Sequence, residues 1–383
     1  MSWQHTIEQA LQQQHARQGW RMRTVHAAAD RLPYLLINGQ NQLNFAGNDY
    51  LGLSRHEAVI QAWQHGLSRY GAGSGASGHV VGYTEVHEAL EAHLAQWLGY
   101  ERALLFNSGY AANQALVQAL ARKDSVLLMD KLCHASLQEA AAQSDALVRR
   151  YGHCRHDVLA RHLAQHGARN TLVATEGVFS MDGDQPDLLE LRRLCDEHGA
   201  WLLVDDAHGI GVCGSEGRGS AAAAGIQADI LVVTFGKAVG VAGAAVLCRH
   251  STAEYLLQFA RHLIYSTAMP PAQALALHEA LHQVAKADAA RAQLQANIYD
   301  FRQRFVSGSL GLLPSYTPIQ PLLCGDNDAV LAAAAALQAQ GLWVGAIRPP
   351  TVPIGQGRLR ITLSAMHQSE HISALLAALE HIA

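Results

Sequence analysis

A single lysine that follows a buried apolar run is the first residue able to carry chemistry. Residues 230–234 are apolar or β-branched, which is typical of a buried strand in a parallel sheet. Lys237 comes just after this run, among glycines and alanines, so its amine has little room to reach water. Burial lowers the pKa of an amine and favours Schiff-base chemistry. A surface lysine after a strand would show the same local pattern. Lys237 can therefore be assigned to a site only if other reactive residues lie near it.

Polar and titratable residues follow the other expected strands in the same way. Asp205 and His208 come after one apolar run, and His134 follows another. Ser108, Gly109 and Tyr110 open a helix after the first run. Because ligands gather beyond the carboxyl ends of strands in such sheets, these groups should converge on one edge. The expected strands are 103–106, 126–129, 172–174, 201–204, 230–234 and 244–247.

Together these residues supply what a pyridoxal phosphate (PLP) enzyme requires. Lys237 would form the Schiff base, and Asp205 would keep the pyridine nitrogen protonated. The free amides and dipole of the helix that starts at Ser108 would hold the phosphate. The sequence therefore predicts PLP as the cofactor.

Other site types use some of the same residues. Asp205, Asp206 and His208 could bind a divalent ion, and Ser180 with His208 could form a hydrolase pair, although no G-x-S-x-G motif exists. Neither explains Lys237 or the phosphate-binding turn, so we predict no metal site. A PLP-binding regulator would need a helix-turn-helix segment and a basic face, and the chain has neither.

Composition excludes several other classes of protein. The 383 residues are 49% apolar and 16% charged, with a net charge of −4, so neither a disordered chain nor a nucleic-acid partner is expected. No apolar run reaches the length of a membrane span, and the six cysteines are scattered. We expect a cytoplasmic protein with reduced thiols and no membrane partner. The glycine-rich loop 71–79 follows no strand, which argues against a Rossmann dinucleotide site.

The order of the elements indicates an α/β fold with a second, smaller domain. Helical patterns between the strands predict a mainly parallel central sheet with helices on both faces. Residues 1–25 read as an amphipathic helix that Arg21 and Arg23 close, and the pattern changes near residue 290 to short strands and helices. We therefore predict an N-terminal helical segment over 1–45, a large PLP-binding α/β domain over 46–288 and a small α+β C-terminal domain over 289–383.

The motifs that carry this chemistry resemble those of the α-oxoamine synthases over nearly the full chain. The matching stretches are Ser108-Gly109-Tyr110, Asp130 with His134, TEGVFSMDGD at 175–184, VDDAHG at 204–209 and TFGK at 234–237. Members of this family are fold-type-I PLP-dependent transferases that condense an amino acid with an acyl thioester and release CO2. Residues 1–4, 48–53 and 347–353 look most like members that use L-alanine and pimeloyl-CoA or pimeloyl-acyl carrier protein. A ligase for glycine and acetyl-CoA, or an aminotransferase, remains an alternative.

The resemblance also implies roles for single residues. Lys237 would anchor PLP and then move the substrate proton, His134 would stack on the ring, and His208 would contact the phenolic oxygen and the thioester carbonyl. Asp205 would pair with the ring nitrogen. The remaining cofactor contacts would come from Gly109, Tyr110, Ser180 and Thr234.

Substrate-binding residues are expected mainly near the C-terminus. Arg360 would clamp the carboxylate of the amino acid, because a planar guanidinium matches a carboxylate, and Arg348 and Thr351 are close rivals. Arg21 would meet the distal carboxylate of the acyl chain, and Asn48 the bound amino acid. Members of the family are homodimers, which implies that loop 71–79 and residues 266–267 serve the neighbouring subunit's site.

Overall fold

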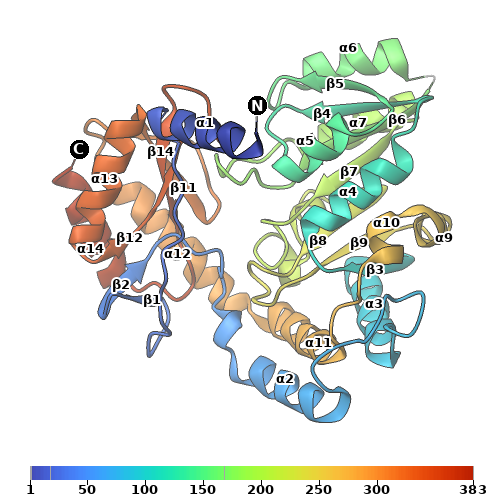
Figure 1. The fold of residues 1–383 in the computed structure, drawn as a ribbon, viewed down its shortest axis with the longest axis horizontal. Coiled ribbons are helices and arrows are strands. Elements are labelled where there is room, and N and C mark those ends of the chain that lie inside the picture. Colours follow the sequence, from blue (N-terminus) through green and yellow to red (C-terminus); the bar gives the residue numbers. More distant parts are fainter. Residues whose placement is uncertain (1, 18, 168, 383) are drawn as a thin grey trace. The chain divides into compact units, whose positions relative to one another are not determined.

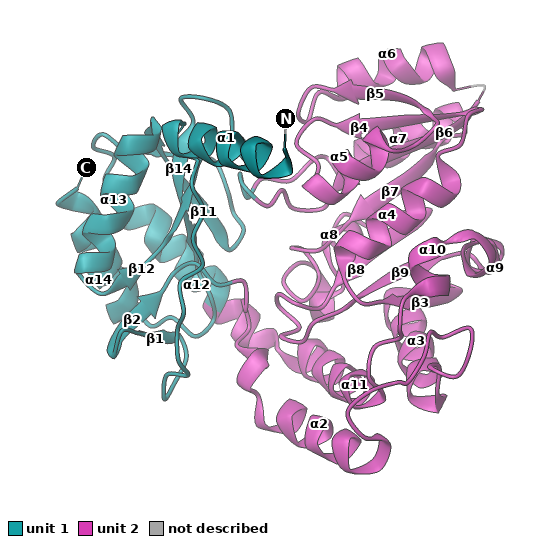
Figure 2. Cartoon of the chain, viewed as in Figure 1, with its two compact units in different colours: residues 1–47, 181–183, 294–383 teal, residues 48–180, 184–293 magenta. Residues whose placement is uncertain are grey.

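The computed structural model describes residues 2–17, 19–167 and 169–382 (Figure 1). The chain divides into two compact units (Figure 2). Unit 1 comprises residues 1–47, 181–183 and 294–383, and unit 2 comprises residues 48–180 and 184–293. The contacts therefore group the N-terminal part of the chain with its C-terminal part, whereas the sequence suggested a separate N-terminal segment. Met1 and Ala383, the outer ends of the predicted domains, lie outside the described residues.

Unit 2 is built on a seven-stranded sheet of order β3-β9-β8-β7-β6-β4-β5. The five strands from β8 to β5 are parallel, and β9 is antiparallel to both its neighbours. The connection from β8 to β9, residues 235–243, is too short for a crossover helix, so β9 must reverse direction. The strands are β3 (Arg102–Phe106), β4 (Ser125–Asp130), β5 (Leu147–Tyr151), β6 (Asn170–Glu176), β7 (Trp201–Asp205), β8 (Ile230–Thr234) and β9 (Ala244–Cys248).

Helices cover both faces of this sheet, as the apolar strands predicted. Leu127 and Met129 share one buried cluster with residues of α4, α5 and α9, and the alternate residues Val126 and Leu128 are buried as well. Alternate side chains point to opposite faces, so neither face meets water. The helices between β3 and α11 are α4 (Gly109–Leu120), α5 (Ala135–Ala142), α6 (His156–His166), α7 (Leu188–His198), α8 (Ser220–Ala223), α9 (His250–Phe259) and α10 (Arg261–Tyr265). A 3₁₀ helix, η2, spans Ser215–Gly217.

A layer of three further helices packs together within unit 2. They are α2 (Glu57–Tyr70), α3 (Glu85–Leu98) and α11 (Pro271–Lys286), and the short 3₁₀ helix η1 (Leu53–Arg55) precedes them. A Cβ atom at Gly66 of α2 would lie 2.5 Å from the Cα atom of Ala272 in α11. Only glycine allows this close approach of the two backbones.

Unit 1 is an α+β assembly with two small sheets. Their orders are β10-β11-β14-β13 and β1-β2-β12. The strands are β1 (Tyr34–Ile37), β2 (Gln40–Asn44), β10 (Gly311–Leu312), β11 (Ile319–Gly325), β12 (Leu342–Trp343), β13 (Gly345–Ile347) and β14 (Gly357–Thr362). The helices are α1 (Trp3–Ala16), α12 (Asp288–Arg304), α13 (Asn327–Ala339) and α14 (Ser369–Glu380), and α12 crosses the boundary between the units. Among the described helices of the whole chain, none is long and apolar enough to cross a membrane.

The N-terminal prediction was wrong in its extent. Helix α1 ends at Ala16, so Arg21 and Arg23 lie beyond it and do not close it. Helix α1 has no buried residue, so no core packing extends it, and Gly19 follows soon after its end. The expected helical segment 1–45 also contains strands β1 and β2, which join β12 in one sheet.

His153 joins the end of β4 to the loop that follows β6. The His153 Nδ1 atom lies 3.1 Å from Asp130 Oδ1, and its Nε2 atom lies 2.6 Å from Asp184 Oδ2. Burial alone would lower the pKa of His153, but the hydrogen bonds to both carboxylates outweigh it and raise this pKa to about 12. His153 is therefore a cation that holds the 176–184 loop.

Replacement of His153 should destabilise the protein in a pH-dependent way. The folded pKa is raised, so the stabilisation is full below the unfolded pKa of about 6.5 and declines as pH rises toward 12. Urea unfolding of His153→Gln should show a loss of about 2 kcal/mol at pH 6 and a smaller loss at pH 8.5. The control is His65→Gln on the exposed part of α2, which should change little at either pH. A loss that grows with pH would contradict this assignment.

Candidate functional site

Lys237 lies just beyond the carboxyl end of β8, as predicted. Its Nζ atom donates to the Thr234 Oγ1 atom at 3.2 Å, and the lysine is half-buried. Thr234 in turn donates to the Ala207 carbonyl at 3.5 Å, in the loop that follows β7. A Cβ atom at Gly109 would lie 2.4 Å from the Thr234 Cγ2 atom. The end of β8 and the start of α4 can therefore meet only because residue 109 is glycine.

Asp205 and His134 are joined through two polar residues. Asn113 on α4 donates to the Asp205 Oδ2 atom at 2.6 Å and to the Ser136 Oγ atom at 2.9 Å. Ser136 Oγ also lies 2.9 Å from the His134 Nδ1 atom. The second carboxylate oxygen, Asp205 Oδ1, accepts from the Ala207 backbone amide at 3.1 Å. This series of hydrogen bonds fixes the Asp205 carboxylate and orients the His134 ring through its Nδ1 atom.

The predicted residues also act on one another electrostatically. Desolvation lowers the pKa of His134, the nearby Asp205 opposes this effect, and Lys237 adds to it. Burial raises the pKa of Glu176 well above its ordinary value, and Asp205 raises it further. Hydrogen bonds from the backbone of His134, the charge of Lys237 and a backbone bond from Ser180 favour ionised Glu176 but do not outweigh burial. Lys237, Asp205, His134 and Ser180 thus belong to one site within unit 2.

Asp206, next to Asp205, has a different environment. Its Oδ2 atom accepts from the Ser220 backbone amide at 2.6 Å, and burial raises its pKa to about 6. A Cβ atom at Gly177, Gly209 or Gly219 would lie 2.0–2.2 Å from an Asp206 oxygen. Asp206 is therefore enclosed by backbone. Asp205, Asp206 and His208 are bonded to different groups and, among the described residues, do not form one of the side-chain groups suited to a metal ion.

His208 is buried and bonded to a tyrosine from the start of unit 2. The Tyr50 hydroxyl lies 2.7 Å from the His208 Nδ1 atom and donates to the Asn48 Oδ1 atom at 3.2 Å. Asn48, predicted to bind the amino acid, is thereby linked to His208, predicted to contact the cofactor. This bond fixes the orientation of the His208 ring through its Nδ1 atom.

The start of α4 has the form of an anion-binding site. Ser108 is the N-cap, and its hydroxyl accepts from the Ala111 amide at 3.2 Å. Gly109 and Tyr110 belong to the first helical turn, whose amides lack acceptors within the helix. The Tyr110 hydroxyl donates to the Glu139 carboxylate on α5, so this side chain points to a neighbouring helix and the predicted phosphate contact would fall to its backbone amide.

These residues fit PLP. Asp205 is 5% exposed, and each of its oxygens has a hydrogen bond and a lone pair to spare for a protonated ring nitrogen. Asp205 is itself buried, so a cationic partner there would offset the cost of burying its negative charge. The helix start at Gly109 suits the phosphate, and the Lys237 amine lies in the same site.

Three residues of the site were not predicted from the sequence. Asn113 and Ser136 form the link between Asp205 and His134, and Tyr50 holds His208. An asparagine on the buried face of an alanine-rich helix was a usable signal for Asn113, because buried polar groups are bonded. Nothing in the sequence pairs Tyr50 with His208.

The predicted substrate arginines lie in unit 1. Arg360 is 6% exposed on β14, between β11 and β13. Arg348 is partly exposed and donates to the Trp20 carbonyl at 3.1 Å. Thr351 and Arg21 are exposed. Arg358, two residues before Arg360 and on the same face of β14, forms an ion pair with Asp182.

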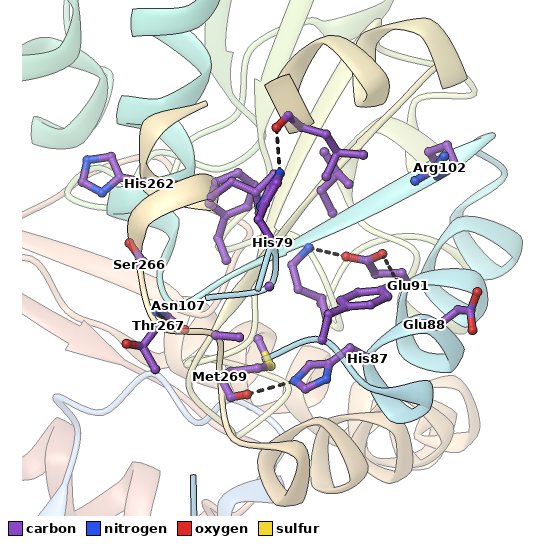
Figure 3. Close-up of a pocket in the computed structure, with 18 residues that line it drawn as sticks. His79, His87, Glu88, Glu91, Arg102, Asn107, His262, Ser266, Thr267 and Met269 are labelled. Atoms are coloured by element: carbon purple, nitrogen blue, oxygen red, sulfur yellow. Dashed lines mark hydrogen bonds between the residues drawn. The ribbon is translucent and has the colours of Figure 1, made fainter. Parts of the chain in front are cut away.

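A separate cavity of about 330 Å³ lies elsewhere in unit 2 (Figure 3). Glu91 of α3 lies at this cavity, and burial raises its pKa to about 7 although Tyr83 and the Leu105 amide donate to it at 2.8 and 2.9 Å. Ser266 and Thr267, expected to serve a neighbouring subunit, also line it, whereas Lys237 and Asp205 do not. The cavity is therefore distinct from the site at the strand ends.

The chain resembles known proteins in both sequence and fold. Residues 40–379 match the family model described as aminotransferase class I and II. An 8-amino-7-oxononanoate synthase from Serratia proteamaculans (strain 568) is 57% identical over 382 residues, which cover 100% of both chains. A serine palmitoyltransferase from S. paucimobilis, solved with PLP bound, has a TM-score of 0.94 at 26% identity, covering 100% of this chain and 98% of that one.

An 8-amino-7-oxononanoate synthase structure from Francisella tularensis has a TM-score of 0.76 at 31% identity and covers 89% of this chain and 96% of that one. The likeness thus extends from the family to full-length relatives that share more than half of the residues. The chain belongs to the aminotransferase class I and II family and, within it, to the 8-amino-7-oxononanoate synthases.

Proposed function

We propose that this chain condenses L-alanine with a pimeloyl thioester, of CoA or acyl carrier protein, to give 8-amino-7-oxononanoate, CO2 and the free thiol in biotin biosynthesis. The 57% identity over the full length to an 8-amino-7-oxononanoate synthase supports this reaction. The observation that carries the chemistry is the Lys237 amine, held beside Thr234 in the same electrostatic environment as Asp205 and His134. The cofactor is PLP.

When bound, PLP supplies an electron-withdrawing ring that stabilises negative charge on the α-carbon of the amino acid. Asp205, held by Asn113, would keep the ring nitrogen protonated, and His134 would stack on the ring. The Lys237 amine removes the α-proton of L-alanine and later returns a proton to the product. Between these transfers the α-carbon attacks the thioester carbonyl, the thiol leaves, and the alanine carboxylate departs as CO2. Gly109 and Tyr110 bind the phosphate through their amides, and Ser180 and Thr234 complete the contacts.

His208 would contact both the cofactor and the acyl donor in this scheme. Its Nδ1 atom is bonded to Tyr50, and its ring would contact the phenolic oxygen of the cofactor and the thioester carbonyl. Asn48, bonded to the same tyrosine, contacts the bound amino acid. A tyrosine that holds both residues would orient them together.

Replacement of Lys237 tests the chemistry. Lys237→Ala should fold normally and lower kcat by at least about 100-fold, because the variant lacks the amine that moves the α-proton. In the wild-type protein, PLP joined to Lys237 as a Schiff base should give a visible absorption band. Borohydride should reduce the Schiff base, abolish this band and leave the cofactor covalently attached to Lys237. The control is Lys131→Ala, since Lys131 also follows a strand, β4, but is exposed. Near-normal turnover by Lys237→Ala would overturn the mechanism.

Substrate panels separate this function from its alternatives. The protein should turn over L-alanine with pimeloyl thioesters in preference to glycine or L-serine with acetyl, succinyl or palmitoyl thioesters. Turnover of glycine with acetyl-CoA alone would make it a 2-amino-3-oxobutyrate ligase. Release of a keto acid without a thioester would make it an aminotransferase.

We assign Arg360 as the clamp for the carboxylate of the amino acid, ahead of Arg348 and Thr351. Arg360 is buried, so an ion pair there is little weakened by water, whereas Arg348 is partly exposed and bonded to a carbonyl. Arg21 is a proposed contact for the distal carboxylate.

Arginine-to-lysine changes test this choice. Arg360→Lys should raise the KM for L-alanine about tenfold or more, because lysine cannot bind a carboxylate in the bidentate manner, while PLP affinity stays unchanged. Arg348→Lys is the matched control and should change this KM much less. A larger effect from Arg348→Lys would reverse the assignment.

We further propose that the chain forms a homodimer through the surface beside loop 71–79. The Ser74 hydroxyl donates to the Ala268 carbonyl at 2.7 Å, and Ser77 forms a β-bridge with Thr267, so the two segments expected at the interface lie together. Val80 and Val81 next to them are 72% and 70% exposed, which is unusual for adjacent apolar residues outside an interface.

The mass in solution tests this surface. The wild-type protein should have the mass of a dimer by light scattering, and the double variant Val80→Asp, Val81→Asp should be largely monomeric and less active. Leu189→Asp on α7 is a control, because Leu189 is 62% exposed but lies far from the loop in sequence. A monodisperse, fully active wild-type monomer would contradict the proposal.

A further inference from the structure

Three histidines meet on two packed helices of unit 2, away from the residues described above. His93 lies on α3, and His278 and His282 lie one turn apart on α11. The ring centroid of His93 is 4.7 Å from that of His278 and 5.0 Å from that of His282, and the last two are 5.3 Å apart. Each ring thus contacts both others.

The spacing of the ring nitrogens suits a shared metal ion. One nitrogen from each histidine lies within 4.8 Å of the other two. Two nitrogens bound to one zinc ion, each at about 2.1 Å, are at most about 4.2 Å apart, so small rotations of the side chains close the site. The Nδ1 atom of His93 is buried and has no hydrogen-bond partner among the described residues. Buried polar atoms are nearly always bonded, and a metal ion would satisfy this one.

The charge state of the three rings is also suitable, because a metal binds neutral imidazole. Burial lowers the pKa of His93 to about 4, and His278 and His282 add to this effect. Burial lowers the pKa of His278 too, with a further contribution from His282 and an opposing one from Glu279.

A second group of possible ligands, Asp130, His153 and Cys154, differs on this point. Both ring nitrogens of His153 are bonded to carboxylates, and its pKa is raised to about 12. The Asp130 carboxylate also accepts the Cys154 amide at 2.8 Å. This group is already neutralised by an internal proton and does not need an ion.

We propose that His93, His278 and His282 form a binding site for a borderline divalent transition-metal ion, with zinc preferred, that clips α3 to α11. Imidazole ligands suit such ions, and three of them leave one position for water. The clip would add to the existing bond between the His87 Nε2 atom of α3 and the Met269 carbonyl just before α11, at 2.9 Å (Figure 3). The ion would have a structural role, since Lys237 and Asp205 are not among its ligands.

Cobalt titration of the holoenzyme tests the site. After treatment with EDTA, added Co²⁺ should give a visible d–d absorption band that saturates at one ion per chain, and Zn²⁺ should displace it. His93→Gln and His278→Gln should weaken Co²⁺ binding by at least about tenfold. The ion should also raise the Tm of the wild-type protein, because it binds only the folded site.

Matched variants make the result decisive. His282→Gln changes an exposed ligand and should fold normally, so its loss of Co²⁺ affinity and of the Tm shift excludes misfolding as the cause. His65→Gln on α2 and Cys154→Ser in the second group should keep both. Absence of saturable binding to the wild-type protein would overturn the proposal. Equal binding by all three site variants, or loss of binding only in Cys154→Ser, would overturn it as well.

Discussion

Three carboxyl groups are buried together at the carboxyl ends of β6 and β7, and the site depends on how each is stabilised. Glu176 and Asp205 are register partners in the sheet, and Asp206 is the next residue. Burying like charges is costly, and the protein handles each group differently. The pKa of Glu176 is raised well above its usual range, which favours its neutral form, and Asp206 is enclosed by backbone and bonded to Ser220. Asp205 accepts hydrogen bonds from the Asn113 side chain and the Ala207 amide, and its charge partly offsets the lowering of the pKa of His134 by desolvation, so it is the group suited to a cationic ring nitrogen.

The sequence was enough to predict several of the side chains that lie at this edge of the sheet. Apolar runs separated by helical patterns predict parallel strands, and parallel strands bring their final residues to one edge. Lys237, Asp205 and His134 were located in this way. Asn113 and Tyr50 were not, because each lies far along the chain from its partner and neither follows a strand. Their contacts depend on helix packing and loop paths, which periodicity does not determine.

Other differences from the predicted structure have equally local causes. Strand β9 reverses direction because the connection at 235–243 is too short for a crossover helix, and the spacing of the two apolar runs, rather than their length, indicates this. Strand β5 was missed because Arg149 and Arg150 interrupt its apolar pattern at the edge of the sheet. Sequence also named Arg348 and Arg360 as rivals without separating them. Arg360 is buried whereas Arg348 is partly exposed, which supports Arg360 as the proposed clamp, and Arg358 of the same region is paired with Asp182.

Histidine shows most clearly why composition alone is a weak guide to function. The chain has 22 histidines, and two of them, His153 and His93, are partly buried and have pKa values that are shifted in opposite directions. Two carboxylates make His153 a cation that fastens a loop, whereas burial among other imidazoles keeps His93 neutral. A neutral imidazole beside two more can serve as a ligand, and a cation between carboxylates cannot. The chemistry available to each histidine is therefore set by its neighbours in the folded chain. The packing of α3 on α11 supplies these neighbours for His93, and the end of β4 and the loop after β6 supply them for His153.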